Sequence, residues 1–180
     1  SSSADYVIPP TACIIQEELG LPETCLSIEI KHGCSGWVVG LNSAASLIMG
    51  GCLKRALLLC GDTSTLLHSP FDKETRPLFG DAGSCTALEF DPTASALEFE
   101  HGTRGKDFKS IYTPVGGCRN TVTAKDLEFI EYGPNQLRRN IDCTMDGMNV
   151  FAFGMSVAPK SVKRLAEKYV LDLEQIDYLL

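Results

Sequence analysis

The sequence predicts an α/β protein in which strands and helices alternate along the chain. Stretches with helical spacing of apolar residues are bounded by proline or glycine, and short apolar runs of strand length lie between them. Hydrophobic residues make up 44% of the 180 residues and charged residues 22%, which is ordinary for a globular protein with a packed core. This alternation favours layers of helices on a sheet.

In the first third of the chain, residues 1–3 look like a loose end, and four elements follow. Thr11–Leu19 is preceded by proline and followed by glycine, which predicts a helix. Cys25–Lys31 alternates apolar and polar residues and therefore predicts a strand. Cys34–Met49 has small and apolar residues on nearly every face, which indicates a buried helix. Arg55–Gly61 is an apolar run, for which we expect a central strand with parallel neighbours.

The pattern changes at residues 64–77, which hold two prolines and mixed charges and are expected to form a loop. Gly80–Gly83 predicts a tight turn into a strand over Ser84–Phe90. Asp91-Pro92 then breaks the pattern, and we place the boundary between two structural halves there. Residues 1–91 would form the first half and residues 92–180 the second.

The second half begins with a predicted strand over Ala96–His101. Residues 102–145 are rich in glycine, proline and charge, and we expect a long excursion with short elements. A helix follows from Asn149 to Tyr169, in which Pro159 should produce a kink or a restart. Glu174–Leu180 looks like the start of another strand and stops within an apolar run, so we expect the sequence to be a piece of a longer protein.

The charge balance argues against nucleic acid as a partner. Sixteen basic and 23 acidic residues give a net charge of −7, whereas proteins that bind a phosphate backbone show a basic footprint. One group of basic residues has helical spacing and has two readings, a docking site for an acidic protein or a solvated helix face. This group consists of Lys160, Lys163, Arg164 and Lys168.

The eight cysteines include no CxxC pair, so the usual spacing of a zinc site is absent and no metal is expected. Several of them lie in apolar runs, where cysteine behaves as a small hydrophobic residue. We therefore expect reduced thiols and a cytoplasmic protein. No signal peptide is visible, and no apolar run reaches the roughly 18 residues of a membrane span, so no membrane partner is expected.

Cys34 differs from the other cysteines because it follows a predicted strand and a glycine and opens a predicted helix. Free backbone N–H groups and the positive end of the helix dipole meet at such a point. Both favour the thiolate, which is the nucleophilic form of cysteine. The same N–H groups can hold the oxyanion that forms when a thioester is attacked. The alternative is an inert cysteine beside a turn.

Other residues near these motifs are weaker candidates. His32 lies two residues before Cys34 and could act as its base, although the turn does not require this contact. Asp81, between Gly80 and Gly83, could be catalytic, and turn chemistry explains it equally well.

Recognisable motifs occur in five segments, namely Ile28–Gly36, Lys54–Thr63, Asp72–Thr75, Leu78–Gly83 and Met145–Phe151. Together they resemble the β-ketoacyl-acyl-carrier-protein synthase III family. Ile28–Gly36, with Cys34-Ser35-Gly36, resembles the active-site segment of the family. Lys54–Thr63 is similar to its strand that ends in a glycine and an acidic residue. Asp72–Thr75 resembles its Asp-Arg-x-Thr element, and Leu78–Gly83 its Phe-Gly-Asp-Gly-Ala-Gly run. Met145–Phe151 resembles a Met-x-Gly-x-x-Val-Phe segment. The motifs occur in the family's order and at compatible spacing.

The resemblance implies a thiolase-like fold of layered α-β-α-β-α architecture, here incomplete, and usually a homodimer. It implies an acyltransferase of fatty-acid biosynthesis in which Cys34 takes an acyl group from acyl-coenzyme A. Malonyl-acyl-carrier protein would then lose CO₂ and attack the acyl-cysteine. No cofactor is implied, because acyl-coenzyme A is a substrate. By position, the acyl and pantetheine path would be lined by Leu78, Phe79, Met145, Gly147 and Phe151.

Three departures from the family pattern stand out. His32-Gly33 replaces the small residues that usually precede the cysteine. Lys73 stands where an arginine often packs on the adenine of the coenzyme, and lysine lacks that planar face. The family's catalytic histidine and asparagine are expected only after Leu180, so we expect the 180-residue piece to be inactive in condensation.

Alternative readings stay open. Another thiolase-fold acyltransferase, such as a chalcone-synthase-like, hydroxymethylglutaryl-coenzyme A synthase-like or quinolone-type enzyme, would share the cysteine. A non-catalytic fragment that only self-associates is a second reading. A papain-type protease is disfavoured because Ser35 and Gly36 separate Cys34 from Trp37. The sequence does not identify the acyl donor.

Overall fold

The computed structural model describes residues 1–178, and the chain forms two compact units. Unit 1 consists of Ser1–Leu67 and Phe79–Ala94. Unit 2 consists of His68–Leu78 and the chain from Ser95 onward. The loop at 68–78 therefore leaves unit 1 between its two strands and packs with the later part of the chain.

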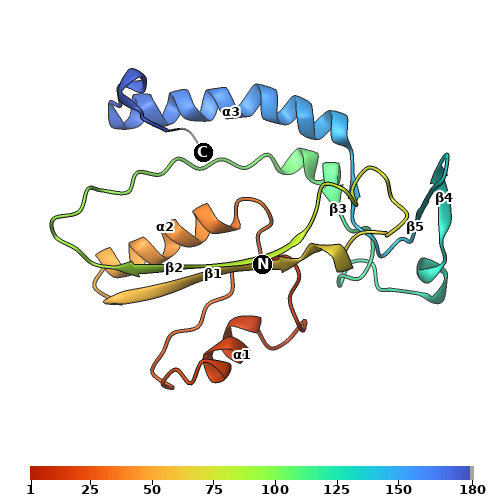
Figure 1. The fold of residues 1–180 in the computed structure, drawn as a ribbon, viewed down its shortest axis with the longest axis horizontal. Coiled ribbons are helices and arrows are strands. Elements are labelled where there is room, and N and C mark those ends of the chain that lie inside the picture. Colours follow the sequence, from red (N-terminus) through yellow and green to blue (C-terminus); the bar gives the residue numbers. More distant parts are fainter. Residues whose placement is uncertain (179–180) are drawn as a thin grey trace. The chain divides into compact units, whose positions relative to one another are not determined.

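Unit 1 is built around a two-stranded antiparallel ribbon (Figure 1). Strand β1 (Arg55–Thr63) pairs with β2 (Asp81–Glu89) in a continuous register. Helix α2 (Gly36–Met49) packs on β1, and α1 (Thr11–Glu18) lies on the other side of the ribbon in Figure 1. Both helices form where the sequence predicts them, but the expectation that α2 is a buried helix is wrong, because only Gly40 and Ile48 of it are buried. A helix that is apolar on nearly every face is buried only where other chain covers those faces.

The expectation that β1 is a central strand with parallel neighbours is wrong. Among the described residues β1 has one neighbour, the antiparallel β2, and its side chains alternate between half-buried and exposed. Leu57 and Leu59 are 52% and 40% exposed. An apolar run predicts burial on both faces, but burial itself requires neighbours that cover both faces.

The strand predicted over Cys25–Lys31 is also not formed. The segment has no regular secondary structure, and within residues 1–178 no strand pairs with it. Alternation of apolar and polar residues selects a face, but a strand also needs a hydrogen-bonding partner. The segment predicted as a strand over Ala96–His101 is irregular for the same reason.

Several element boundaries differ from the sequence expectation. Helix α2 begins at Gly36, not at Cys34, because the preceding residues form a turn in which Gly36 N donates to Gly33 O at 2.8 Å. The turn expected at Gly80–Gly83 is wrong, since β2 already begins at Asp81 and Gly83 pairs with Gly61.

Residues 1–3 are anchored, contrary to the expectation of a loose end. Backbone N–H groups of Ser2 and Ser3 donate to Asp62 Oδ1 at 2.6 and 2.9 Å, and the hydroxyl of Ser1 donates to the same oxygen at 3.1 Å. Burial alone would raise the pKa of the Asp62 carboxyl, but these donors lower it to about 2. The carboxylate therefore ties the start of the chain to the end of β1.

Unit 2 contains two small antiparallel ladders within the excursion that the composition predicts. Strand β3 (Ile111–Tyr112) pairs with β6 (Thr144–Met145), and β4 (Ile130–Gly133) pairs with β5 (Gln136–Arg138). The β4–β5 turn contains Asn135 at φ 57°, a left-handed conformation that asparagine tolerates. Short 3₁₀-helical segments complete the connections of unit 2, at Gly105–Ser110, Ala124–Leu127 and Leu173–Gln175, and another lies in unit 1 at Ser64–Leu66.

Helix α3 (Gly147–Tyr169) confirms the long predicted helix and begins two residues earlier than expected. Asp146 caps it by accepting from Asn149 N at 3.0 Å. The helix continues through Pro159 without a restart, because a proline removes only one backbone hydrogen bond from a long helix. The strand predicted from Glu174 is not present up to residue 178, and residues 179–180 lie outside the described part of the chain.

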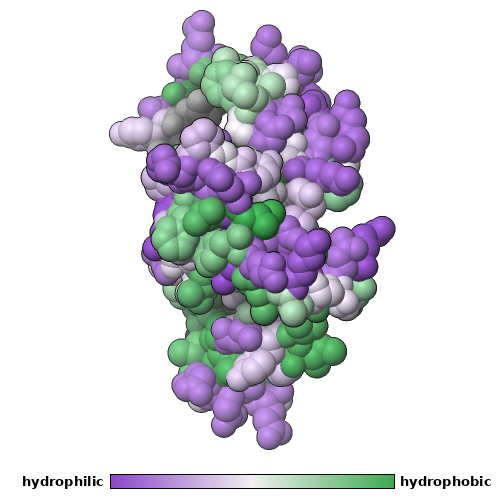
Figure 2. All heavy atoms as spheres, turned by 90° about the vertical axis from the view of Figure 1, so that its right-hand side faces the viewer, coloured by the Kyte–Doolittle hydropathy of each residue, from purple (hydrophilic) through white to green (hydrophobic). Residues whose placement is uncertain are grey.

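Burial in the two units is unusual. Within residues 1–178, Ile48 is the one large apolar side chain classed as buried, at 7% exposure, and Figure 2 shows apolar atoms in several places on the surface. The most buried large side chains are polar instead, namely Ser69, Asp72, Thr75 and Asp142. Across the same residues, no helix is both long and apolar enough to cross a membrane.

Candidate functional site

Cys34 lies in the turn that leads into α2 and is exposed to solvent. Ser35 occupies the N-cap position, but its side chain makes no capping hydrogen bond, and the first turn of α2 holds no acidic residue. The first N–H group of the helix, Gly36 N, donates to Gly33 O, and the cap side chain supplies no acceptor for the N–H groups that follow. A helix start of this kind favours a negative charge nearby.

His32 is placed by Ser35. Its Nδ1 lies 3.2 Å from Ser35 Oγ, and among the described residues no bond joins its ring to Cys34. The structure therefore does not support His32 as the hydrogen-bonded base of Cys34. The Ser35 hydroxyl thus contacts the His32 ring and makes no capping bond to α2.

The other cysteines are less buried than the sequence predicts. The structure contains free thiols only, and those of Cys13, Cys25, Cys52, Cys85 and Cys118 are exposed. Cys143 is the clearest structural cysteine, since burial raises the pKa of its thiol above the ordinary value. Exposure alone thus does not distinguish Cys34 from the other exposed cysteines. Its position just before the start of α2 does.

Asp81 has a structural role in unit 1. Its carboxylate accepts from Thr65 N at 2.8 Å and from Thr65 Oγ1 at 2.7 Å. These bonds hold the turn after β1 against the start of β2, which favours the structural reading of Asp81 over the catalytic one.

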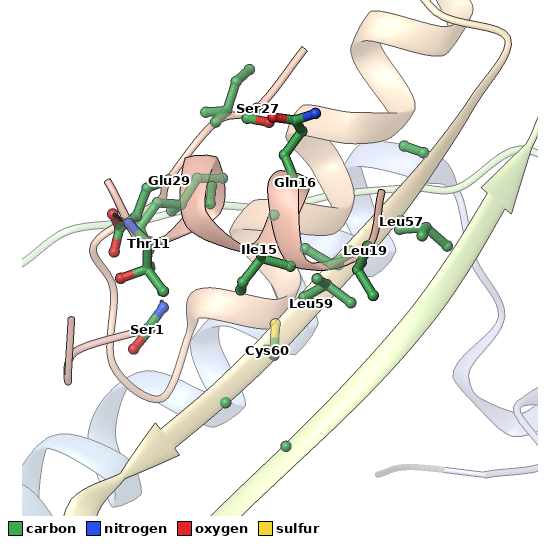
Figure 3. Close-up of a pocket in the computed structure, with 18 of the residues that line it drawn as sticks. Ser1, Thr11, Ile15, Gln16, Leu19, Ser27, Glu29, Leu57, Leu59 and Cys60 are labelled. Atoms are coloured by element: carbon green, nitrogen blue, oxygen red, sulfur yellow. Dashed lines mark hydrogen bonds between the residues drawn. The ribbon is translucent and has the colours of Figure 1, made fainter. Parts of the chain in front are cut away.

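A cavity of about 1,480 Å³ lies in unit 1 between α1, the irregular segment at 21–30 and β1. Figure 3 shows Ile15 of α1 and Leu19, which follows that helix, beside Leu57 and Leu59 of β1 in this space. Cys34 is not among the lining residues, although Gly36 at the start of α2 is. The cavity is therefore an apolar gap between helix and sheet, and not a chamber around the candidate nucleophile.

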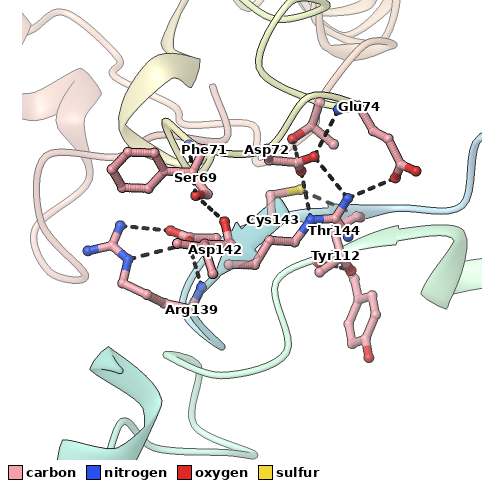
Figure 4. A network of polar contacts seen from close by, with 12 residues as sticks. Ser69, Phe71, Asp72, Glu74, Tyr112, Arg139, Asp142, Cys143 and Thr144 are labelled. Carbon is pink, nitrogen blue, oxygen red and sulfur yellow. Dashed lines mark hydrogen bonds and ion pairs between the residues drawn. The ribbon is translucent and has the colours of Figure 1, made fainter. Parts of the chain in front are cut away.

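The polar network of unit 2 joins the loop at 68–78 to strand β5 (Figure 4). The Nε of Arg138 lies 2.7 Å from Asp72 Oδ2, and its Nη2 donates to Asp72 Oδ1 at 3.1 Å and to Glu74 Oε2 at 2.8 Å. Ser69 Oγ donates to the carbonyl oxygen of Leu137 at 2.5 Å. Burial would raise the pKa of Asp72, but Arg138, Thr75 and Glu74 N hold it below its ordinary value.

A second cavity, of about 530 Å³, lies at this network and contains the predicted coenzyme contact Lys73. Lys73 and Arg76 come from the loop, and Asn135 comes from the β4–β5 turn. Arg138 and Asn135 carry no motif that the sequence analysis could use. Only the Asp72–Thr75 resemblance pointed to this region.

The remaining predicted site residues fall into two groups. Met145, Gly147 and Phe151 lie together where β6 leads into α3, and Phe151 is 65% exposed. Leu78 ends the loop of unit 2 and is 64% exposed, whereas Phe79, half-buried, belongs to unit 1 with Cys34. The structure thus brings three of the predicted lining residues together by chain continuity and divides the others between the units.

Two members of the basic row on α3, Arg164 and Lys168, make contacts within unit 2. Arg164 Nε lies 2.8 Å from Glu100 Oε1, and Lys168 Nζ donates to the carbonyl oxygen of Phe99 at 2.9 Å. These contacts hold the irregular segment at 99–100 against the helix, which favours the structural reading of the row. Over residues 1–178, no group of three histidine, cysteine or acidic side chains is placed to hold a metal ion.

Residues 28–105 match the sequence profile of a family described as 3-oxoacyl-[acyl-carrier-protein] synthase III. The chain is 31% identical over 178 residues to a Campylobacter jejuni protein named as a 3-oxoacyl-[acyl-carrier-protein] synthase 3, covering 99% of the chain and 50% of that protein. It is 29% identical to a β-ketoacyl-[acyl-carrier-protein] synthase III of Clostridium kluyveri, covering 98% and 51%. The chain therefore spans about half the length of these relatives.

Solved structures that are similar to the chain carry the same family description. A crystal structure of a 3-oxoacyl-(acyl-carrier-protein) synthase III superposes with a TM-score of 0.90 at 31% identity, over 97% of this chain and 52% of that one. The Burkholderia xenovorans 3-oxoacyl-(acyl-carrier-protein) synthase gives 0.80 at 34% identity, over 97% and 48%. The fold is accordingly the thiolase-like α/β fold, represented over about half of its full extent. The chain is therefore similar to members of the 3-oxoacyl-[acyl-carrier-protein] synthase III family over about half of their length.

Proposed function

We propose that the whole protein, at the length of its relatives, is an acyltransferase of the β-ketoacyl-acyl-carrier-protein synthase III type in fatty-acid biosynthesis. The observation that carries this is the place of Cys34, an exposed thiol directly before the uncapped start of α2. Such a position combines a nucleophile with N–H donors for the oxygen of an attacked thioester.

The proposed reaction has two halves. In the first, the Cys34 thiolate attacks the carbonyl carbon of an acyl-coenzyme A, and the coenzyme A thiolate leaves. In the second, malonyl-acyl-carrier protein loses CO₂, and the carbanion that remains attacks the acyl-cysteine. A carbon–carbon bond forms, and the Cys34 thiolate is released. The backbone N–H groups at the start of α2 would hold the oxyanion of each tetrahedral intermediate.

Lys73 is the proposed contact of the coenzyme, and Leu78, Phe79, Met145, Gly147 and Phe151 are the proposed wall of the acyl and pantetheine path. Exposed apolar side chains at Leu78 and Phe151 support this, because a long apolar ligand would cover them. A lysine attracts the coenzyme's phosphates as a point charge, but it does not stack on adenine as an arginine does. We therefore expect donor binding to depend on phosphate contacts at this position.

The 180-residue chain by itself is proposed to be inactive in condensation, since the resemblance places the family's catalytic histidine and asparagine after Leu180. We further propose a cytoplasmic homodimer that takes acyl-coenzyme A and malonyl-acyl-carrier protein as substrates. A purified 180-residue chain that formed β-ketoacyl product from these substrates would contradict the first proposal.

Intact mass of the whole protein after exposure to a panel of acyl-coenzyme A thioesters tests the covalent step. We expect one added acyl group, absent in Cys34→Ala and retained in Cys25→Ala, a control that removes another exposed thiol. The donor that gives the fastest adduct would name the substrate class. A folded protein that gains no acyl mass, or gains it equally in Cys34→Ala, would refute the function.

A further inference from the structure

Lys73 lies in a cavity that two separate segments create. Lys73 and Arg76 belong to the loop at 68–78, whereas Asn135 belongs to the turn between β4 and β5. Together with Pro70, Phe71, Asp72 and Pro77, these side chains line an open depression of about 530 Å³. Its hairpin side, at Asn135, depends on the loop and the hairpin staying joined.

Arg138 makes the charged part of that junction, beside the bond from Ser69 Oγ to the Leu137 carbonyl oxygen. Its side chain is 3% exposed, and the Asp72 side chain that it meets is fully buried. The guanidinium contacts both carboxylate oxygens of Asp72, at 2.7 and 3.1 Å, and lies 4.4 Å from the ring centroid of Tyr132. One buried arginine from β5 thus binds the loop on one side and packs on a β4 ring on the other.

The same guanidinium holds the residues on both sides of Lys73. Asp72 precedes Lys73, Glu74 follows it, and both carboxylates pair with Arg138. The Asp72 carboxylate also accepts from Glu74 N at 2.9 Å and from the Thr75 hydroxyl. The backbone is therefore fixed immediately before and after Lys73.

Arg138 also keeps the neighbouring carboxylates from pairing with the Lys73 ammonium group. Within residues 1–178 no ion pair of Lys73 is formed, although acidic residues flank it on both sides. Because Arg138 occupies these two carboxylates, they do not neutralise the lysine. Without Arg138, both would be available to pair with the Lys73 ammonium.

We propose that Arg138 is a positioning residue for the donor, holding Lys73 outward, unpaired and beside Asn135 so that it meets the phosphate groups of coenzyme A. The inference rests on the proposed function, in which Lys73 contacts the coenzyme. A buried ion pair such as Arg138–Asp72 adds little net stability compared with an apolar pair. Its role here is to fix the geometry of the loop around Lys73.

A double-mutant cycle on the whole protein tests this, with coenzyme A affinity measured by titration calorimetry. Lys73→Ala and Arg138→Met should each weaken coenzyme A binding about fivefold, the size of one partly solvated charge contact. In the Lys73→Ala background, Arg138→Met should cause no further loss, because its effect passes through Lys73. A merely structural role would weaken binding in both backgrounds.

Arg139→Met is the matched control. Arg139 is the next residue and is also ion-paired, to Asp142 at 2.7 Å, but within residues 1–178 it forms no ion pair with Asp72 or Glu74. Its loss should leave coenzyme A affinity unchanged. Should Arg138→Met fail to fold, Arg138→Lys runs the same cycle, since lysine keeps the charge but not the bidentate geometry.

The outcomes separate the inference from the function. Equal losses from the arginine substitution in both backgrounds, or no loss in either, overturn the role of Arg138 even when Cys34 is acylated. Whole protein that neither binds coenzyme A nor gains an acyl group at Cys34 overturns the proposed function, and the inference falls with it.

Discussion

Asp72 and Arg138 form the most buried ion pair of the described chain, and stability should depend on pH through it. Hydrogen bonds from Arg138, Thr75 and Glu74 N outweigh burial and lower the pKa of Asp72 in the folded state. A carboxyl whose folded pKa is lowered contributes stability above its unfolded pKa of about 3.9. That contribution is lost as the pH falls through the folded pKa.

The predicted result is a steeper loss of unfolding free energy in wild type than in Asp72→Asn below about pH 4. At pH 7 the variant should be less stable by about 3 kcal/mol, because Arg138 keeps a buried charge without its main partner. Urea unfolding between pH 3 and pH 7 measures both. Parallel curves for the two proteins would show that Asp72 does not carry this dependence.

Residue roles were predictable from sequence only where the signal is local. Cys34 could be singled out because glycine, cysteine and a helix start are adjacent in the chain. The bond between His32 and Ser35 was not foreseen, although the two lie three residues apart. Arg138 and Asp72 are separated by 66 residues, and no spacing rule connects such a pair.

At the scale of elements, the contact between α2 and β1 depends on the absence of a side chain at Gly40. A Cβ built at Gly40 would lie 2.5 Å from Leu58 Cδ1, so a larger residue must displace Leu58 or the helix. We expect Gly40→Val to lower the unfolding free energy of the whole protein by about 1–3 kcal/mol through overpacking.

Gly154→Ala provides the contrast, since Gly154 is inside α3 and a Cβ there meets no atom within 4 Å. It should stabilise the protein by about 0.5–1 kcal/mol, because alanine restricts the unfolded chain and favours helix. Urea unfolding of both variants tests whether Gly40→Val lowers the unfolding free energy and Gly154→Ala raises it. Equal effects of the two substitutions would show that α2 does not pack on β1 as closely as the structure shows.

Helices were predicted more accurately than strands, and the reason is physical. The signals of α1 and α3 are internal to each segment, so their bounds came within about two residues. The pairing of β1 with β2, and the lack of a partner for Cys25–Lys31 within residues 1–178, depend on segments distant in sequence. The residue pattern of a segment can suggest a strand, but it does not identify the strand that pairs with it.

At the scale of the whole molecule, large apolar side chains are exposed in both compact units, including Leu57 and Leu59 of β1 and Phe151 of α3. Apolar surface of this extent is covered in stable proteins by further chain or by a partner.

The 180-residue chain, purified alone, should therefore associate with itself and bind an apolar dye such as anilinonaphthalene sulfonate. Light scattering should show a mass that rises with protein concentration, because association removes apolar surface from water. Replacing Leu57 and Leu59 together by serine should reduce both the dye signal and the mass increase, whereas Leu97→Ser, on an exposed irregular segment, should change them less. A monodisperse chain without dye binding at every concentration would mean that its two units cover these side chains themselves, and the need for additional covering chain would then disappear.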